Sequence, residues 1–185
     1  MLFRFFLPIC CFSLTLLCQD GGRNTVTAGV GGGFPTGGEQ AYLTSNLPSG
    51  AAFSASYEFR ILKYLAPEVG VVNSIPLIPS YDPHHPGSSR ERVTLVSFGL
   101  RGIAPLNHGR IELFAGLSAV HVSSTYYELS DYGIGSWLGQ INGGGRIAID
   151  KRRHFWIGPT ARFSRDGGRP VQEWVSLTGD FGFRF

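Results

Sequence analysis

The sequence is poor in cysteine and in charge. All three cysteines, Cys10, Cys11 and Cys18, lie near the start of the chain, so the residues after Cys18 can form no disulfide and offer no thiol nucleophile. Charged residues make up 16% of the chain, compared with roughly 25% in a typical soluble domain. The formal net charge of +3 is too small to indicate a nucleic-acid partner, and none is expected.

Long apolar runs are also missing after the first residues, so no transmembrane helix is expected there. The apolar run from Phe5 to Leu17 is shorter than the roughly 20 residues that a spanning helix needs. Since it follows a positive charge, it predicts a secretory signal peptide, residues 1–18, followed by a single domain, residues 19–185. The alternative is a lipoprotein signal acylated at Cys18, which the large Leu17 in front of that residue disfavours.

Glycine and aromatic residues are abundant, with 26 glycines and 13% aromatics. After the leader, apolar and polar residues alternate along segments that are separated by turn signals. Such alternation predicts strands with one apolar and one polar face. The eight predicted strands span about residues 24–34, 53–61, 64–73, 91–103, 110–122, 136–149, 154–164 and 174–185.

The connections between these segments alternate in length. Those after the first, third and fifth segments are long, and those after the second, fourth and sixth are short. Membrane barrels have this asymmetry between their two ends. The pattern predicts an all-β fold, an eight-stranded antiparallel up-and-down transmembrane β-barrel, with both chain ends on the side of the short turns.

The last segment alternates to the final residue, with Val175, Leu177, Phe181, Phe183 and Phe185 on one face. An edge strand of a soluble sandwich would explain the alternation but not the terminal Phe, because chain ends tend to fray. This ending resembles the C-terminal signature of bacterial outer-membrane β-barrel proteins, in which a terminal Phe marks the closing strand. The resemblance implies an outer-membrane location in a Gram-negative cell envelope and recognition of Phe185 by the barrel-assembly machinery.

The polar faces should line the barrel interior and the apolar faces should contact lipid. Eight strands leave room for side chains only, and buried charges are costly unless paired. We therefore expect a filled, hydrogen-bonded interior and not an open pore. The charged residues expected inside are Glu58, Arg60, Glu68, Arg101, Arg110, Glu112, Arg146, Arg162, Asp180 and Arg184.

A soluble, lipocalin-like barrel would share this alternation with its apolar face inside. Two expected belts of aromatic residues favour the membrane barrel, although scattered aromatics are common in any β protein. The belt beside the short turns comprises Tyr57, Phe59, Tyr64, Phe155 and Phe185. The belt beside the long loops comprises Tyr126, Tyr127, Tyr132, Trp137 and Trp174.

The run from Arg162 to Gly168, with Glu173 beyond it, resembles the end of the outer-membrane lipid A deacylase family. The resemblance implies Ser164 as the nucleophile that attacks an acyl ester of lipopolysaccharide and Glu173 as the acid that orients the base. The position of the family's His base is occupied by Arg162, which stays protonated and cannot act as a base. The alternation also points Arg162 and Ser164 inward, so an enzyme of this kind would be impaired.

Other candidate sites are weaker. His121 precedes Ser123 by two residues, which makes it a second candidate catalytic pair or a histidine at the rim. The adjacent His84 and His85 point apart in an extended chain and predict no metal site. The run 143–145 of three glycines lacks the strand-to-helix context of a phosphate loop and indicates a strand position that needs small residues.

The sequence favours a non-enzymatic role, structural or based on binding through the loops, in the cell envelope. No metal or cofactor is expected. The expected partners are outer-membrane lipids, including lipopolysaccharide, and the chain is expected to be a monomer. The alternatives are the lipid A deacylase-like hydrolase, with Ser164, Glu173 or His121 as its catalytic residues, and a passive channel, which the crowded interior disfavours.

Overall fold

A computed structural model describes residues 23–35, 50–76, 93–124, 137–165 and 173–185. The described residues form eight strands and one short 3-10 helix. The strands are β1 (Asn24–Pro35), β2 (Gly50–Phe59), β3 (Leu65–Pro76), β4 (Val93–Leu106), β5 (Ile111–Ser124), β6 (Trp137–Ala148), β7 (Phe155–Arg165) and β8 (Glu173–Arg184), and the helix is η1 (Asn107–Gly109). No helix in the described ranges is long and apolar enough to cross a membrane.

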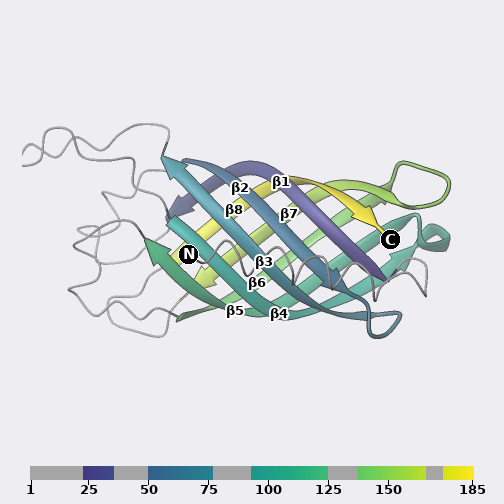
Figure 1. Cartoon of the computed structure of the whole chain (residues 1–185), viewed down its shortest axis with the longest axis horizontal. Helices are drawn as coiled ribbons and strands as arrows, with labels where there is room; N and C mark the ends of the chain where they lie inside the picture. The colour runs from purple at the N-terminus through teal and green to yellow at the C-terminus, as the bar shows by residue number, and fades with distance from the viewer. Residues whose placement is uncertain (1–22, 36–49, 77–92, 125–136, 166–172) are drawn as a thin grey trace, which may run out of the picture.

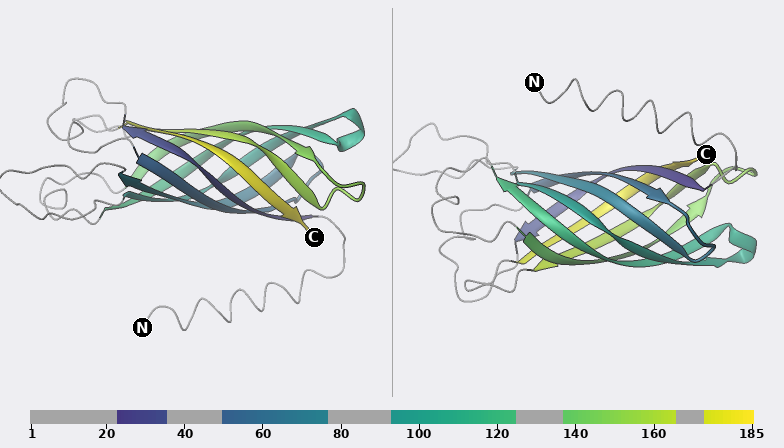
Figure 2. Two further views of the ribbon diagram at one scale, coloured as in Figure 1. Left: turned by 90° about the horizontal axis from the view of Figure 1, so that it is seen from above. Right: turned by 60° about the horizontal axis from the view of Figure 1, so that its bottom comes forward.

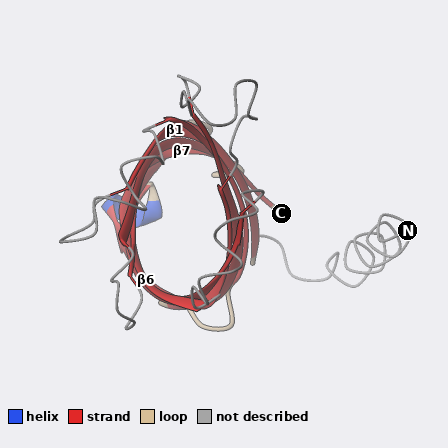
Figure 3. Ribbon diagram, turned by 90° about the vertical axis from the view of Figure 1, so that its left-hand side faces the viewer, coloured by secondary structure: helices blue, strands red, loops and turns tan. Residues whose placement is uncertain are grey.

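The strands form one closed antiparallel barrel in chain order (Figure 1). Each strand pairs with its neighbours in sequence, and β1 closes the barrel against β8 with Ala28 opposite Phe181. The end-on view in Figure 3 shows the strands as a continuous ring. Closure leaves no free strand edge, which a barrel in lipid requires because every backbone group must be paired. The predicted fold is therefore confirmed.

The two ends of the barrel differ. The short connections 60–64, 107–110 and 149–154 lie at the same end as the C-terminus, which we call the turn end (Figure 2). There the backbone N–H of Phe185 donates to Asn24 O at 2.9 Å, and Asn24 N donates to Phe185 O at 3.1 Å. The opposite end, which we call the loop end, is where the connections 36–49, 77–92, 125–136 and 166–172 join the strands. Their residues, including the belt tyrosines Tyr126, Tyr127 and Tyr132, lie outside the described residues.

The side chains are distributed in the reverse of a soluble protein. On β5, Leu117 is 69% exposed, whereas Glu112 is 1% exposed. The other strands repeat the pattern, with exposed Val30, Phe98 and Ile141 on the outer face and charged residues inside. A soluble barrel would bury its apolar face, and an exposed apolar surface this continuous is one that lipid covers. The lipocalin-like alternative is therefore excluded.

Some details of the sequence prediction are wrong. Pro105 and Leu106 were expected in a turn, but they pair within β4 opposite Glu112 and Ile111. Arg110 was expected inside, but it precedes β5 in the short turn and its side chain is exposed. Trp174 was expected in the aromatic belt beside the long loops. It is instead buried inside the barrel, because it alternates with the outward residues of β8.

The three glycines at 143–145 lie in β6, at a place in the strand where small residues are needed, as predicted. A Cβ at Gly144 would collide with the carbonyl oxygen of Pro159 on β7. Pairing between β6 and β7 is interrupted between Thr160 and Ile157, where Pro159 has no N–H to donate. The missing side chains let the two strands approach closely at this interruption.

Candidate functional site

The interior of the barrel near the turn end contains a network of buried carboxylates and guanidinium groups. Its side chains come from β2, β3, β4, β5, β6 and β8 and from Arg60 directly after β2, so their contacts connect opposite walls. Alternation directs each of them inward, as the sequence predicted. The members, which we call the ion-pair network, are Glu58, Arg60, Glu68, Arg101, Glu112, Arg146 and Arg184.

Glu112 of β5 is the centre of this network. Its Oε2 accepts hydrogen bonds from Nη2 of Arg60 at 2.6 Å, Nε of Arg146 at 2.8 Å and Nη2 of Arg184 at 2.7 Å. Nη1 of Arg184 donates to the other oxygen at 3.2 Å. A buried carboxylate with so many cationic donors is stable because each lost water contact is replaced.

Glu58 of β2 extends the network by forming ion pairs with arginines on β4 and β6. Nη2 of Arg146 lies 2.8 Å from its Oε1, and Nη1 of Arg101 lies 3.3 Å from its Oε2. Arg101 also donates to Glu68 through its Nη2 atom. Because Arg146 binds both Glu58 and Glu112, the two carboxylates belong to one connected set of charges.

Two aromatic side chains complete this part of the interior. The guanidinium carbon of Arg101 lies 4.2 Å from the ring centroid of Phe114, and that of Arg184 lies 4.2 Å from the ring centroid of Trp156. Desolvated contacts of this kind contribute roughly 2 kcal/mol each. Neither ring was expected at this site, although the alternation that places Glu112 inside also places Phe114 inside.

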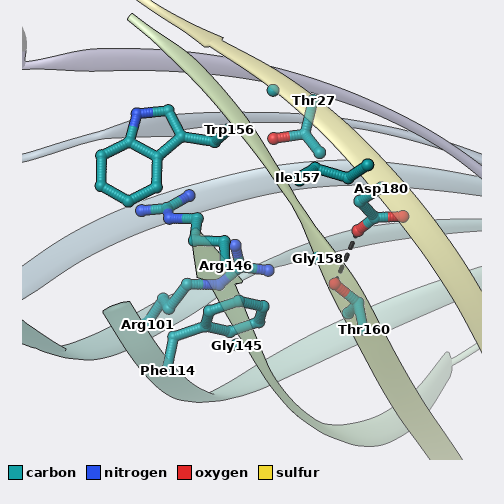
Figure 4. A pocket seen from close by; sticks show the side chains of 11 residues that line it. Thr27, Arg101, Phe114, Gly145, Arg146, Trp156, Ile157, Gly158, Thr160 and Asp180 are labelled. Atoms are coloured by element: carbon teal, nitrogen blue, oxygen red, sulfur yellow. Dashed lines mark hydrogen bonds between the residues drawn. The ribbon is translucent and has the colours of Figure 1, made fainter. Parts of the chain in front are cut away.

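A small pocket lies between the ion-pair network and a second polar cluster around Asp180 (Figure 4). Asp180 accepts hydrogen bonds from Oγ1 of Thr160 at 2.6 Å and from Oγ of Ser54 at 3.2 Å. Its Oδ2 lies 3.7 Å from Nη2 of Arg162. Gly29 makes room for this carboxylate, since a Cβ at that position would collide with it.

The interior near the loop end contains an apolar cluster beside uncharged polar side chains such as Gln140 and Ser164. A cluster of buried side chains from five strands and from Trp174 of β8 fills the section beyond Asp180. Its members are Ala52, Val72, Leu95, Val120, Leu138 and Trp174. The described interior is thus filled by ion pairs towards the turn end and by apolar and uncharged polar side chains towards the loop end, which agrees with the expected filled, hydrogen-bonded interior.

The residues predicted by resemblance to the deacylases lie on opposite faces of the sheet. Ser164 is 1% exposed inside the barrel, where its Oγ donates to Oε1 of Gln140 at 3.2 Å. Arg162 is also inside. Glu173 belongs to the outward series of β8 and pairs with Nε of Arg165 at 3.4 Å. The structure therefore brings Ser164 and Arg162 to one face and places Glu173 on the other.

His121 lies on the outer face of β5. Its ring packs edge-on against Trp137 with 5.1 Å between centroids. The strand β6 separates it from β7, so His121 and Ser164 lie on different strands and different faces. The side chain of Ser123 lies outside the described residues.

A metal site finds no support in the described parts of the chain. There, no group of three His, Cys, Asp or Glu side chains could hold a metal ion. The adjacent pair His84 and His85 lies outside the described residues.

Comparison with known proteins identifies the fold. The structure is similar to Neisserial surface protein A, with a TM-score of 0.61 and 13% identity over 90% of this chain and 100% of that chain. It is similar to Ail of Yersinia pestis (TM-score 0.55, 12% identity, 90% and 100% covered) and to the outer membrane protein OprG of Pseudomonas aeruginosa (TM-score 0.54, 10% identity, 90% and 98% covered). The chain matches no protein-family model and no curated protein sequence.

These similarities define the structural class of the chain. The chain has the fold of the small eight-stranded outer-membrane β-barrel proteins. At these identities the likeness establishes the fold, and function has to be argued from the residues of this chain.

Proposed function

We propose that this protein is inserted in the bacterial outer membrane after removal of residues 1–18. There it acts as a non-conducting scaffold, surrounded by lipid and lipopolysaccharide, whose loop-end connections bind a partner. Its closing strand, ending at Phe185, is recognised by the barrel-assembly machinery, and the barrel is a monomer.

The observation that carries this proposal is the filled interior. Glu112 and Glu58 are bound to arginines from opposite walls at 2.6 to 2.8 Å. Transport through the barrel would require these buried ion pairs to separate, which is strongly unfavourable. The outer face is apolar and suited to lipid, and the connections at the turn end are short. The loop-end connections are therefore the longest segments that a partner in water could bind.

The composition of the loop-end connections supports binding. The chain has 7 tyrosines. Those in the connections are Tyr42, Tyr81, Tyr126, Tyr127 and Tyr132, among many Ser and Gly residues. Antibody binding loops use this mixture, because tyrosine supplies contact area at low entropic cost and small residues adapt.

The net charge of the loop-end connections indicates which charge a partner's surface should carry. Their acidic residues, Glu39, Asp82, Glu91, Glu128, Asp131 and Asp166, outnumber their basic residues, Arg90, Arg92 and Arg169. A protein or glycan surface that is neutral or basic is therefore favoured over an anionic one. Ail, a structural neighbour, has been described in complex with the heparin analogue sucrose octasulfate, so we expect this chain to differ from Ail in the charge of its ligand.

Two measurements test the proposal. Planar-bilayer recordings of the purified barrel should show no conductance steps, and a stable open conductance would contradict the scaffold role. Cells that display the chain should be applied to arrays of glycans and of basic and acidic proteins. Binding that is lost when Tyr126, Tyr127 and Tyr132 are replaced by Ser, with insertion intact, supports the loops as the binding surface. Unchanged binding contradicts it.

The hydrolase alternative depends on Ser164, Glu173 and His121 and stays a prediction. Mass spectrometry of lipid A from a Gram-negative host that expresses the chain tests it directly. Loss of an acyl chain would show an ester hydrolase, and intact lipid A would support the scaffold.

A further inference from the structure

Among the described residues, exposed cationic side chains are concentrated at the turn end. Both lysines of the chain, Lys63 and Lys151, are in short turns there. Among the described residues, Asp150 is the one acidic side chain in these turns. The exposed basic residues at this end are Arg23, Lys63, Arg110, Lys151, Arg152 and Arg153, and His108 is exposed beside them. By sequence, the loop-end connections carry the opposite excess, of acidic residues.

Two of the turns meet to form one surface. The N–H of Ala148 donates to Arg110 O at 2.8 Å, which joins the turn before β5 to the end of β6, directly before the next turn. A Cβ at Gly109 would lie 3.1 Å from Nη1 of Arg153, so this guanidinium lies against the neighbouring turn. We call the surface formed by His108, Arg110, Lys151, Arg152, Arg153 and His154 the basic patch.

The backbone holds the basic patch in a defined shape. Oδ1 of Asp150 accepts the N–H of Phe155 at 2.9 Å, and the Arg153 carbonyl accepts the indole N–H of Trp156 at 2.7 Å. Asp150 therefore stabilises the backbone of its own turn, and its single negative charge leaves the surface formed with Arg110, Lys151, Arg152 and Arg153 positively charged. Within the described residues, Arg110, Lys151 and Arg152 form no ion pair.

Aromatic rings mark the depth at which the basic patch lies. On the outer face of β7 and β8, Phe155 lies 5.2 Å from Phe183 and 5.9 Å from Phe181 between ring centroids. Phe183 stacks on Phe185 at 5.9 Å and on His154, a member of the patch, at 6.0 Å. Aromatic girdles of membrane barrels lie at the boundary between hydrocarbon and headgroups. The patch, directly beyond this girdle, therefore lies at the level of the lipid phosphates.

We propose that the basic patch binds the phosphate headgroups of anionic phospholipids in the leaflet that surrounds the turn end. The proposal rests on the membrane insertion proposed above. Each Lys or Arg near an anionic lipid surface shifts partitioning by about fivefold. A group of them held in a fixed arrangement, without carboxylate partners among the described residues, selects anionic lipids over zwitterionic lipids around the barrel.

The test measures which lipids surround the barrel. The full chain, purified from membranes, is reconstituted in phosphatidylcholine containing spin-labelled phosphatidylglycerol or spin-labelled phosphatidylcholine. The motionally restricted fraction of each label gives their relative association with the protein. We expect the wild type to prefer phosphatidylglycerol, and the triple variant Arg110→Gln, Lys151→Gln, Arg152→Gln to lose most of this preference. High salt should weaken the preference in the wild type.

Two control variants accompany the triple variant. Arg110→Lys, Lys151→Arg, Arg152→Lys keeps the charge and should keep the preference. Arg90→Gln, Arg92→Gln removes charge at the loop end and should also keep it. An unchanged preference in the neutral triple variant, or an equal loss in the loop-end variant, would overturn the proposal.

Two further measurements distinguish lipid headgroups from free phosphate as the ligand, and distinguish a failure of this inference from a failure of the proposed function. Inorganic phosphate is titrated into the detergent-solubilised protein, with resonances of the turns followed by NMR. Saturable phosphate binding at the patch without any lipid preference would mean a site for free phosphate, which overturns the lipid assignment. Insertion is checked by heat-dependent gel migration. A chain that does not insert contradicts the proposed function, whereas an inserted chain without lipid preference contradicts this inference alone.

Discussion

Glu112 and Arg184 are bound to each other in the barrel interior, although 72 positions separate them in the chain. Nη1 and Nη2 of Arg184 lie 3.2 and 2.7 Å from the two oxygens of Glu112. Glu112 is on β5 and Arg184 at the end of β8, which are not adjacent strands. The pair therefore crosses the inside of the barrel and ties its last strand to the opposite wall.

Replacing Glu112 with Gln should destabilise the barrel strongly. The substitution leaves Arg60, Arg146 and Arg184 without their shared carboxylate, and breaking a buried ion pair on one side costs about 3–5 kcal/mol. The free energy of unfolding is measured by urea titration of the barrel in lipid vesicles. Glu173→Gln is the matched control, because its partner Arg165 is exposed and such pairs contribute roughly 0–1 kcal/mol. Equal stabilities of the two variants would contradict a central role for Glu112.

Gly29→Ala should also destabilise the barrel. The new Cβ would collide with the carboxylate of Asp180 and with Ser54, and overpacking of this kind costs about 1–3 kcal/mol. Gly102→Ala is the control, since its Cβ would meet only the carbonyl oxygen of Ala115, at 3.6 Å. The same urea titration compares the two, and a loss of stability in the Gly102 variant alone would contradict the close packing of Gly29 against Asp180.

Ser164→Ala should leave lipid A unchanged relative to the wild type, because Ser164 is buried inside the barrel. It should lower the free energy of unfolding by about 1 kcal/mol through the lost hydrogen bond to Gln140. Ser176→Ala is a suitable control, because the buried Ser176 hydroxyl has no hydrogen-bond partner in the described part of the chain and its removal should not destabilise. A change in lipid A acylation that depends on Ser164 would instead support the hydrolase.

Asp150 should make the turn between β6 and β7 sensitive to acid. Desolvation acts to raise the pKa of Asp150, but backbone hydrogen bonds, first that from Phe155, hold it below its ordinary value of 3.8. A group with a lowered pKa stabilises the fold above its unfolded value and loses this effect as the pH falls through the folded value. The stability difference between the wild type and Asp150→Asn should therefore be constant near neutral pH and shrink below about pH 4. A difference that grows in acid would contradict this assignment.

The sequence predicted the strands well and their ends less well. Every described strand coincides with an alternating segment, because a period of two is set by the local chain. The bounds differ by a few residues, as where β2 begins at Gly50 and β4 continues through Pro105. Pairing with a neighbouring strand decides such ends, and local composition at Pro105 indicated a turn instead.

For the candidate site, the sequence indicated which charges point inward but not which of them pair. Alternation placed Glu58, Glu112 and Arg146 inside. Alternation placed Arg110 inside wrongly, because β5 begins one residue later, at Ile111, and Arg110 therefore belongs to the turn. The placement of Trp174 in an aromatic belt was wrong because a position near the end of a strand does not show whether the side chain points into the barrel or outward.

The sequence by itself determined the strand number, the inward and outward faces and the alternation of long and short connections, because all three follow from residue order along one chain. Only the tertiary structure decided how the strands close, which arginine binds Glu112, and that the turns bearing Arg110 and Arg153 form one surface. These contacts join residues far apart in the sequence, and their geometry exists only once β1 has paired with β8.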